Sequence, residues 1–341
     1  MDVQFSDEEL LLRDTVLALA EKAVPDSVAG LDAFDDAALW ARLADAGVLG
    51  LGAAEGLGSL TDAAVAAMAL GRALAPVPYL GCGVLPAHLL ALAGGGGALV
   101  DAVTSGARRV AVGVDPRTWS IATGDTTEVL AWDAAGADAA VVRAPDGPGL
   151  AMLELGAPTP GVDLTRRMRR ARAGAIATGG AGSLGPADEQ RWSCAALALV
   201  SADMVGVMEG ALRLAVEHAL AREQFGVPIG SFQAVQHLLA EQQVNLEGAR
   251  SVTVYAAWAL GHRSPEQAAL AAHTAKAYCS HVGKKLCEAV VQVHGGMGLT
   301  WECRAHVFLK RMIADRAFLG DERVHFRKIA ALRAREAGVG L

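Results

Sequence analysis

Two short stretches of the sequence combine glycines with polar side chains in a way that suits a phosphorylated ligand. The first, REQFGVPIGSFQ, contains Arg222, Phe225, Gly226 and Gln233. Glycine lets a backbone approach a phosphate closely, and arginine presents a rigid charged fork to it. A glutamine amide offers both a donor and an acceptor, which suits a ribose or an adenine edge. These residues predict a site for the phosphates and nucleoside of a cofactor, although a plain corner between two helices would explain them as well.

The second stretch, QVHGGMG, follows about seventy residues later and contains Gln292, Gly295 and Gly296. Glycines at this place also have an ordinary use, because they end helices. We interpret the neighbouring His294 as a packed or capping residue and Met297 as a filler of a gap in the core. The presence of both stretches in one helical region favours a ligand site.

The elements that must position these residues are long helices. Apolar residues recur with helical spacing over 189–224, 231–262, 265–293, 301–318 and 321–336, with short connections between the segments. Ser231 is the expected N-cap of the second segment, and Ser264 followed by Pro265 that of the third. The pattern predicts a four-helix bundle that carries both stretches at its corners.

The rest of the chain predicts two further regions. Ser6 and Glu9 have the spacing of a capping box, and helical patterns recur at 36–47, 61–74 and 85–93. Between 108 and 165 the pattern changes to short apolar runs separated by turn residues, which predicts a small antiparallel β unit. We therefore expect a mainly α chain with a small β middle domain, divided into residues 1–104, 105–188 and 189–341.

Composition excludes several classes of function. The 341 residues carry a formal net charge of −7, so no nucleic-acid partner is expected, and the run RRMRRAR at 166–172 is interpreted as a solvated linker or interface loop. Five cysteines without CxxC spacing indicate reduced thiols and a cytoplasmic protein. No pattern of metal ligands, signal peptide or membrane span is predicted; the apolar run from Leu85 to Val100 is too short and broken to span a bilayer.

The order of the regions, together with R-x-x-F-G and Q-x-x-G-G-x-G, resembles the acyl-CoA dehydrogenase family. That family transfers a hydride from Cβ of an acyl-CoA thioester to FAD while a glutamate removes the α-proton. The resemblance implies FAD as cofactor, an acyl-CoA as substrate and electron-transfer flavoprotein as acceptor. It also implies that Arg222 pairs with the FAD pyrophosphate, that Phe225 and Gly226 pack near the cofactor, and that Gln233 reaches its ADP portion. Gln292, Gly295 and Gly296 would line the adenosine side of a flavin shared across a dimer interface.

The sequence departs from this family at the catalytic base. In most members the glutamate precedes a glycine in the loop before the last helix, and matching Gly320 to that glycine puts Leu319 at the glutamate position. A minority of members carries the base on the first long bundle helix, ten residues before a glycine. Counting back ten residues from Gly206 leads to Ala196, which cannot act as a base. The next residue is Leu197, whereas an arginine is common at that position in the family. Glu322 is a candidate replacement base, although an acid at the start of a helix also suits the helix dipole. Glu209 and Glu217 are weaker candidates, and His325 is interpreted as a packed residue.

The middle region departs from the family as well. Only VGVDPRTW, at 112–119, corresponds to the family's run of small residues around the flavin ring and thioester. The combination resembles the short subunit of actinobacterial α2β2 acyl-CoA dehydrogenases, which act on steroid side-chain thioesters and in which a longer partner carries the base. Two alternatives remain open: a homomeric flavoenzyme with a relocated base such as Glu322, or a helical interaction subunit without enzymatic activity.

Overall fold

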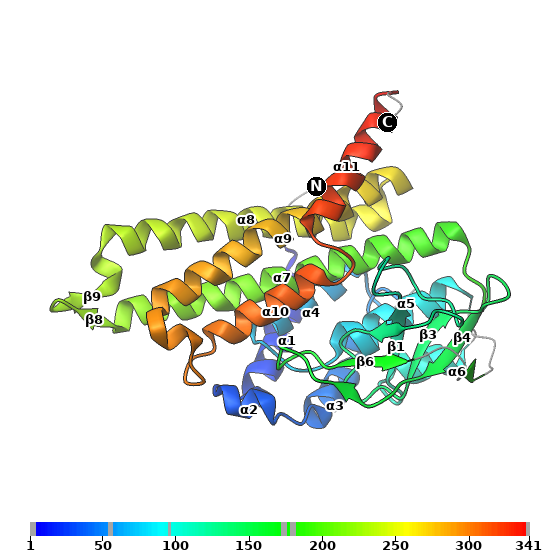
Figure 1. Ribbon diagram of the computed structural model, residues 1–341, viewed down its shortest axis with the longest axis horizontal. Coiled ribbons are helices and arrows are strands. Elements are labelled where there is room, and N and C mark those ends of the chain that lie inside the picture. Colours follow the sequence, from blue (N-terminus) through cyan, green and yellow to red (C-terminus); the bar gives the residue numbers. More distant parts are fainter. Residues whose placement is uncertain (1–4, 54–56, 95–96, 172–175, 178–181, 339–341) are drawn as a thin grey trace.

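The computed structural model describes residues 5–53, 57–94, 97–171, 176–177 and 182–338. Long C-terminal helices run along the longest axis of the molecule, and the N-terminal helices and a small sheet pack against them (Figure 1). One hydrophobic core cluster draws residues from the N-terminal helices, the sheet and the bundle. The fold is therefore mainly α with a small β region, as predicted, while the domain division at 104 and 188 stays a prediction.

The bundle consists of α7 (Pro186–Ala221), α8 (Gln233–His262), α9 (Pro265–His294) and α10 (Ala305–Ala317), and α11 (Glu322–Glu336) projects from it (Figure 1). Helix α7 packs against α4, α8, α9 and α10. It is long and apolar enough to cross a membrane, but 94% of its most apolar window is buried inside the fold. Its hydrophobicity is that of a central bundle helix, which must be apolar all round.

The predicted cap of α9 is confirmed. Ser264 accepts a hydrogen bond from the Gln267 amide at the start of α9, and Gly295, with φ +61°, ends this helix. The prediction for Ser231 was wrong. Ser231 lies in a 3₁₀ turn (Ile229–Ser231), its hydroxyl donates to the Pro228 carbonyl, and α8 begins two residues later without a side-chain cap.

The N-terminal region contains α1 (Asp7–Ala23), α2 (Val28–Asp32), α3 (Ala37–Asp45), a 3₁₀ turn (Val48–Gly50), α4 (Leu60–Arg72), a π-helical turn (Tyr79–Val84), α5 (Leu85–Leu92) and α6 (Ala98–Thr104). The predicted capping box of Ser6 and Glu9 is confirmed. Helix α4 lies so close to α7 that a Cβ atom at Gly206 would meet the Met68 carbonyl oxygen at 2.1 Å. Gly206 is the glycine from which the Ala196 position was counted. Its lack of a side chain is what allows α4 and α7 to approach this closely.

The sheet has the strand order β5-β6-β2-β1-β3-β4-β7. Its strands are β1 (Val110–Val114), β2 (Val129–Ala131), β3 (Ala139–Arg143), β4 (Leu150–Glu154), β5 (Pro158–Thr159), β6 (Met168–Ala171) and β7 (Ile176–Ala177). The expectation of a purely antiparallel unit was wrong, because β1 pairs with β3 in parallel. One of the short apolar runs between 108 and 165, WSIAT at 119–123, forms only isolated bridges, at Ile121 and Thr123.

The arginine run at 166–172 is not simply a solvated linker. Arg166 is buried and forms ion pairs with Asp133 and Asp203, both at 2.8 Å, and its Nε lies 3.7 Å from a carboxyl oxygen of Asp315. Arg311 on α10 binds Asp203 from the other side, so this buried cluster ties the sheet region to α7 and α10. Arg169 and Arg170 belong to β6, and Arg172, the last residue of the run, lies outside the described residues.

Candidate functional site: a cofactor corner and a cavity without a free carboxylate

The first stretch forms a β-hairpin that the sequence analysis missed. Strand β8 (Glu223–Gln224) pairs with β9 (Val227–Pro228), and Phe225 and Gly226 form the two-residue loop with φ +55° and +80°. Positive φ at both central residues is the requirement of a type I′ turn, which joins two-residue hairpins. A glycine at the second loop position was the available signal. A bulky phenylalanine in the first position is unusual, because left-handed backbone costs a non-glycine residue roughly 1–2 kcal/mol.

The polar residues of this stretch point into solvent. Phe225 is 95% exposed, and Arg222 and Gln233 are exposed as well. Among the described residues, the Arg222 guanidinium has neither a hydrogen-bond nor an ion-pair partner. A strained, exposed aromatic beside an unpaired arginine is typical of a binding site rather than of packing.

The structure brings the second stretch to the same end of the bundle. The imidazole of His294, at the end of α9, stacks on His218 of α7 with 4.3 Å between the ring centroids. Gln292, Gly295 and Gly296 are exposed, and a Cβ atom on either glycine would meet nothing within 4 Å. His294 is buried, as predicted, but Met297 is exposed and fills no gap in this chain. An unpaired arginine, two glutamine amides and open glycine backbone fit the pyrophosphate and adenosine of FAD. We call these residues the cofactor corner.

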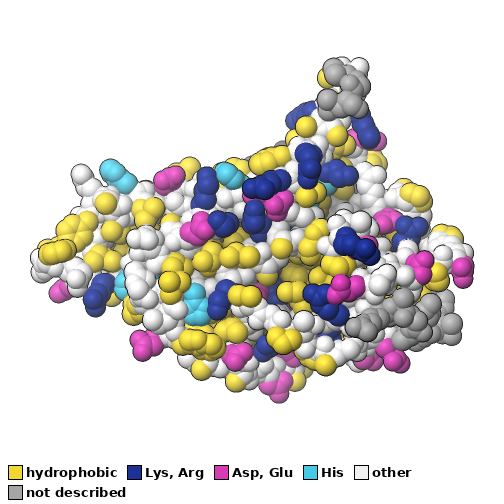
Figure 2. Space-filling view, viewed as in Figure 1, with side chains coloured by type: hydrophobic (Ala, Val, Ile, Leu, Met, Phe, Trp, Pro, Cys, Tyr) yellow, Lys and Arg dark blue, Asp and Glu magenta, His cyan; other side chains and the backbone are white. Residues whose placement is uncertain are grey.

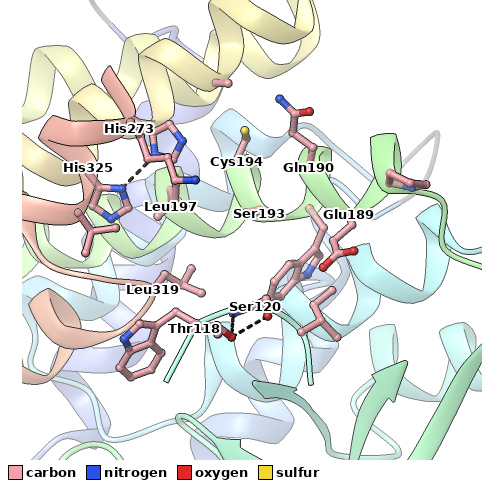
Figure 3. Close-up of a pocket in the computed structure, with 17 residues that line it drawn as sticks. Thr118, Ser120, Glu189, Gln190, Ser193, Cys194, Leu197, His273, Leu319 and His325 are labelled. Atoms are coloured by element: carbon pink, nitrogen blue, oxygen red, sulfur yellow. Dashed lines mark hydrogen bonds between the residues drawn. The ribbon is translucent and has the colours of Figure 1, made fainter. Parts of the chain in front are cut away.

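A cavity of about 360 Å³ lies at the other end of α7, between the bundle and the sheet region (Figure 3). Leu319 lines it, and so do Leu197 and Trp119. These residues come from the three places where the sequence departs from the family: the loop before the last helix, the first bundle helix and the run at 112–119. The structure therefore gathers all three departures around one cavity, which we call the catalytic-type cavity.

Within the described part of the chain, no unpaired carboxylate lines the catalytic-type cavity. Glu189 is the single acidic residue among its lining residues, and it pairs with Arg143 at 3.0 Å. Ala196 is fully buried and is not part of the lining. Since proton abstraction needs a base within hydrogen-bond reach, these walls offer no carboxylate for it.

The other acidic candidates are held elsewhere. Glu322 does not line the cavity; Arg316 donates two hydrogen bonds to it, at 2.7 and 2.6 Å, and these lower the pKa of the Glu322 carboxyl. Glu209 pairs with Arg72 and Arg250, and Glu217 pairs with Arg213. None of these three carboxylates is available at the cavity wall.

The loop that carries Leu319 is held in place by contacts with α9 and with Trp132. Leu319 has φ +60°, and Lys276 on α9 donates to the carbonyl of Gly320 at 2.9 Å and to that of Arg316 at 2.9 Å. Phe318 stacks on Trp132, with 4.3 Å between the ring centroids. These contacts keep a leucine in the left-handed region that it would otherwise avoid.

Two histidines form a hydrogen-bonded pair at the cavity wall, and the sequence analysis did not single out His273. The Nδ1 atoms of His273 and His325 are 3.0 Å apart, and His325 Nε2 lies 3.1 Å from the Gly320 carbonyl oxygen (Figure 3). A carbonyl can only accept, so His325 Nε2 donates to it and His325 Nδ1 accepts from His273. Burial, and then Lys328, lowers the pKa of His273 to about 4. Burial, and then Lys276, lowers the pKa of His325 to about 3. His325 is a packed residue, as predicted.

The cofactor corner and the catalytic-type cavity cannot serve the same ligand within one chain. Along α7, Leu197 and Arg222 are separated by 25 residues, which corresponds to about 38 Å at the helical rise of about 1.5 Å per residue. Among the residues that the structure describes, no group of three or more histidines, cysteines or acids could hold a metal ion. The arrangement is therefore two half-sites, one at each end of the longest helix.

Comparisons with known proteins identify the family. Residues 195–332 match the family model described as acyl-CoA dehydrogenase, C-terminal domain, and residues 6–94 match the one described as acyl-CoA dehydrogenase, N-terminal domain. The chain is 32% identical to acyl-CoA dehydrogenase IpdE2 of Mycolicibacterium smegmatis over 337 residues, covering 96% of this chain and 99% of the relative. It is 31% identical to acyl-CoA dehydrogenase FadE27 of Mycobacterium tuberculosis over 338 residues, covering 86% and 87%.

Two solved structures are similar over nearly their whole length. A chain of the Tcur3481–Tcur3483 steroid ACAD variant has a TM-score of 0.81 and 26% identity, covering 97% of this chain and 99% of that one. A chain of the ChsE4–ChsE5 complex from Mycobacterium tuberculosis has a TM-score of 0.82 and 24% identity, covering 98% and 99%. The resemblance drawn from the sequence is confirmed: the chain belongs to the acyl-CoA dehydrogenase family of FAD-dependent oxidoreductases.

Proposed function

We propose that this protein is the base-lacking subunit of a heteromeric acyl-CoA dehydrogenase. The observation that carries the proposal is the lining of the catalytic-type cavity: Leu319, which the sequence analysis matches to the family's glutamate position, lines it, and Glu189, the single carboxylate among the described lining residues, is paired with Arg143. Within this proposal the α-proton of the acyl-CoA is removed by a glutamate of a longer partner chain. This chain contributes binding and positioning.

The contribution of this chain to the cofactor is the cofactor corner. FAD, when bound, accepts the hydride from the acyl chain. Arg222 would neutralise its pyrophosphate, Gln233 would reach its ADP portion, and Gln292, Gly295 and Gly296 would line the adenosine. Because this corner lies about 38 Å from the chain's own cavity, the flavin ring held with its help belongs in a cavity of another subunit.

The exposed surface near the cofactor corner supports a partner chain. Large hydrophobic side chains gather there (Figure 2), among them Leu220, Phe225, Leu299 and Trp301, each more than half exposed. Monomeric proteins seldom expose contiguous apolar patches of this kind, and such patches mark interfaces. The same end of the molecule thus combines an apolar surface with unpaired polar groups for a shared cofactor.

The nature of the partner and substrate is proposed from the relatives. Two of the similar structures are complexes of two named chains, and one of them is a steroid ACAD. We propose a longer acyl-CoA dehydrogenase subunit as partner, a steroid-derived acyl-CoA as substrate and electron-transfer flavoprotein as acceptor. The five free cysteines are buried thiols, which supports a reducing, cytoplasmic location.

The two alternatives are less well supported. A homomeric enzyme with Glu322 as base requires that carboxylate to leave both of its hydrogen bonds to Arg316. A non-enzymatic interaction subunit gives no reason for an unpaired Arg222 beside a strained, exposed Phe225.

The test is a flavin absorption spectrum combined with mass determination. It is made on the chain purified alone and on the chain co-expressed with a longer homologue that carries the loop glutamate. We expect flavin and acyl-CoA-dependent bleaching only in the mixed oligomer. A homomer with stoichiometric FAD that an acyl-CoA bleaches would overturn the proposal.

A further inference from the structure

A second cavity, of about 350 Å³, adjoins the catalytic-type cavity. Gln190 and Cys194 of α7 line both cavities. Successive residues of a helix are 100° apart, so Glu189 and Ser193 face the first cavity, Ala187 and Arg191 face the second, and the two shared residues lie between them. In Figure 3, Gln190 and Cys194 point to one side of α7 and Glu189 to the other.

Helix α9 follows the same division. Ala269 and His273 line the first cavity, and Pro265 and Ala268 line the second. From Pro265 to His273 the helix rises about 12 Å. The two cavities therefore follow one groove between α7 and α9, and each has a size in the range of roughly 300–1,000 Å³ that is usual for small-molecule sites.

The second cavity is positively charged. Arg191 and Arg263 line it, no carboxylate does, and neither guanidinium has an ion-pair partner among the described residues. Arg263 lies over the ring of Trp258, 4.9 Å from its centroid, which orients the guanidinium plane. Two unpaired arginines beside one cavity favour an anionic group, and a planar guanidinium matches a carboxylate.

His88 is a buried polar group that also faces the second cavity. It is 8% exposed, and its Nδ1 lies 3.1 Å from the Gly52 carbonyl oxygen, to which it must donate. Its Nε2 is then an acceptor, and it has no partner among the described residues. This acceptor suits an ordered water or a donor group; a carboxylate can only accept, so an anion in this cavity would be held by the arginines and not by His88.

The catalytic-type cavity offers an apolar wall and, among the described residues that line it, no unpaired carboxylate. Trp119, Leu197 and Leu319 are among its apolar lining residues. Burial raises the pKa of the Cys194 thiol to about 11, so this cysteine is not a nucleophile at neutral pH. A ligand in this cavity would be bound without being transformed.

We propose that the two cavities together form a non-catalytic binding site for an amphipathic carboxylate. Its apolar body lies against Leu319, and its carboxylate meets Arg191 and Arg263. The word "non-catalytic" rests on the proposed function, because it depends on the absence of a base. The binding itself depends only on the groove.

The test measures binding of decanoate and of decanol to the full-length chain, by tryptophan fluorescence and by calorimetry. The two probes share an apolar chain and differ in charge. We expect saturable one-to-one binding of decanoate and about tenfold weaker binding of decanol, since a charge-assisted contact is lost. Arg263→Gln should weaken decanoate about tenfold and leave decanol unchanged. Ser193→Phe, which fills the first cavity, should weaken both probes.

The matched control is Arg213→Gln, which removes an exposed arginine farther along α7, outside both cavities. Equal affinities for the two probes, or unchanged decanoate binding by Arg263→Gln, would exclude the arginine subsite. Absence of saturable binding would exclude the site altogether. Because the measurement needs neither flavin nor a partner, its failure leaves the proposed function untouched. A flavin-loaded, active homomer would overturn the proposed function without changing the binding result.

Discussion

His273 donates a hydrogen bond from Nδ1 to Nδ1 of His325, across a distance of 3.0 Å at the wall of the catalytic-type cavity. The direction of this bond follows from the Gly320 carbonyl. Because a carbonyl only accepts, His325 donates to it from Nε2, and its Nδ1 is then the acceptor. Two neutral rings thus connect α9, α11 and the loop that carries Leu319. Protonation of His325 Nδ1 would place a hydrogen between two donors and break this connection.

The pair predicts that stability falls as the pH falls below neutrality. The ordinary histidine pKa is near 6.5, and the folded-state values are about 4 for His273 and about 3 for His325. Between about pH 4 and 6.5 the unfolded state binds more protons than the folded state, so the free energy of unfolding rises with pH. At pH 5 each ring should reduce it by about 2 kcal/mol relative to pH 7.5.

Urea unfolding at pH 7.5 and pH 5 measures this effect. His325→Gln should remove about half of the difference between the two pH values, whereas His237→Gln, an exposed histidine on α8, should leave it unchanged. A His325→Gln variant whose stability depends on pH as strongly as that of the unmodified chain would contradict the assignment.

The arginine run offers a comparison between a buried and an exposed charge. Arg166 is 1% exposed and faces Asp133 and Asp203, whereas Arg170 is 49% exposed and pairs with Glu128. Removing one partner of a buried pair leaves an uncompensated charge, so Arg166→Met should reduce the free energy of unfolding by about 3–5 kcal/mol. Arg170→Met should cost less than about 1 kcal/mol. Denaturant unfolding followed by circular dichroism measures both; similar losses would show that the cluster is not what holds Arg166.

Asp315 provides a second variant for the same cluster. Burial, and then the Asp203 carboxylate, raises the pKa of Asp315 well above its usual range, which favours the neutral carboxyl within this cluster. Asp315→Asn should therefore change stability by less than about 1 kcal/mol, although the residue is fully buried. A loss as large as that of Arg166→Met would mean that Asp315 is ionised.

The bundle and the cap residues followed from sequence because they depend on local chemistry. Ser6, Ser264 and Gly295 act within one helical turn, and the apolar period of each helix depends only on its own residues. The family motifs also gave the two parts of the cofactor corner, although its residues stay predictions until flavin binding is measured.

The features that could not be predicted from the sequence depend on contacts between segments that are distant in the chain. In the sequence, Arg166 cannot be distinguished from the other four arginines of its run. It is a core residue because Asp133, Asp203 and Asp315, which are distant in the sequence, surround it in the fold. The parallel pairing of β1 with β3 requires a crossover that no local pattern specifies. The hydrogen bond of His273 could not be predicted either, because its partner, His325, is fifty-two residues away in the sequence.

The hairpin loop predicts a variant that gains stability and loses function. Phe225 has φ +55° and is 95% exposed, so its side chain contributes little burial in the isolated chain. Asparagine tolerates this backbone, and Phe225→Asn should raise the stability of the chain alone by about 0.5–1 kcal/mol. Phe232→Asn, where φ is −80° and the ring is more buried, should not.

Thermal unfolding of the chain alone and flavin content of the mixed oligomer test the loop together. If Phe225 packs near the cofactor or the partner, Phe225→Asn lowers the flavin content while the isolated chain becomes more stable. If the Phe225→Asn variant is more stable and keeps its full flavin content, Phe225 does not pack near the cofactor or the partner.

Glu322 should be dispensable for turnover. Its carboxylate binds Arg316 at the start of α11, and it does not line the cavity. Glu322→Gln should reduce the stability of the chain modestly, by about 1 kcal/mol, and change kcat of the mixed oligomer by less than about twofold. The control is removal of the loop glutamate in the partner, which should abolish activity. A loss of several hundredfold in kcat with Glu322→Gln would instead identify this residue as the base.

Arg222 should affect the flavin and nothing else. The guanidinium is exposed and without an internal partner among the described residues, so Arg222→Ala should leave the stability of the isolated chain within about 0.5 kcal/mol. In the mixed oligomer it would leave the pyrophosphate of FAD without its counter-charge, and we expect at least about tenfold weaker flavin binding. Arg213→Ala, at a position on α7 that precedes Arg222 in the chain, removes a similar exposed charge and should retain the flavin. Flavin titration of the two apo-oligomers separates the roles. Equal flavin affinity in both variants would remove Arg222 from the cofactor corner, and the site would then have to be sought at the glycines after α9 alone.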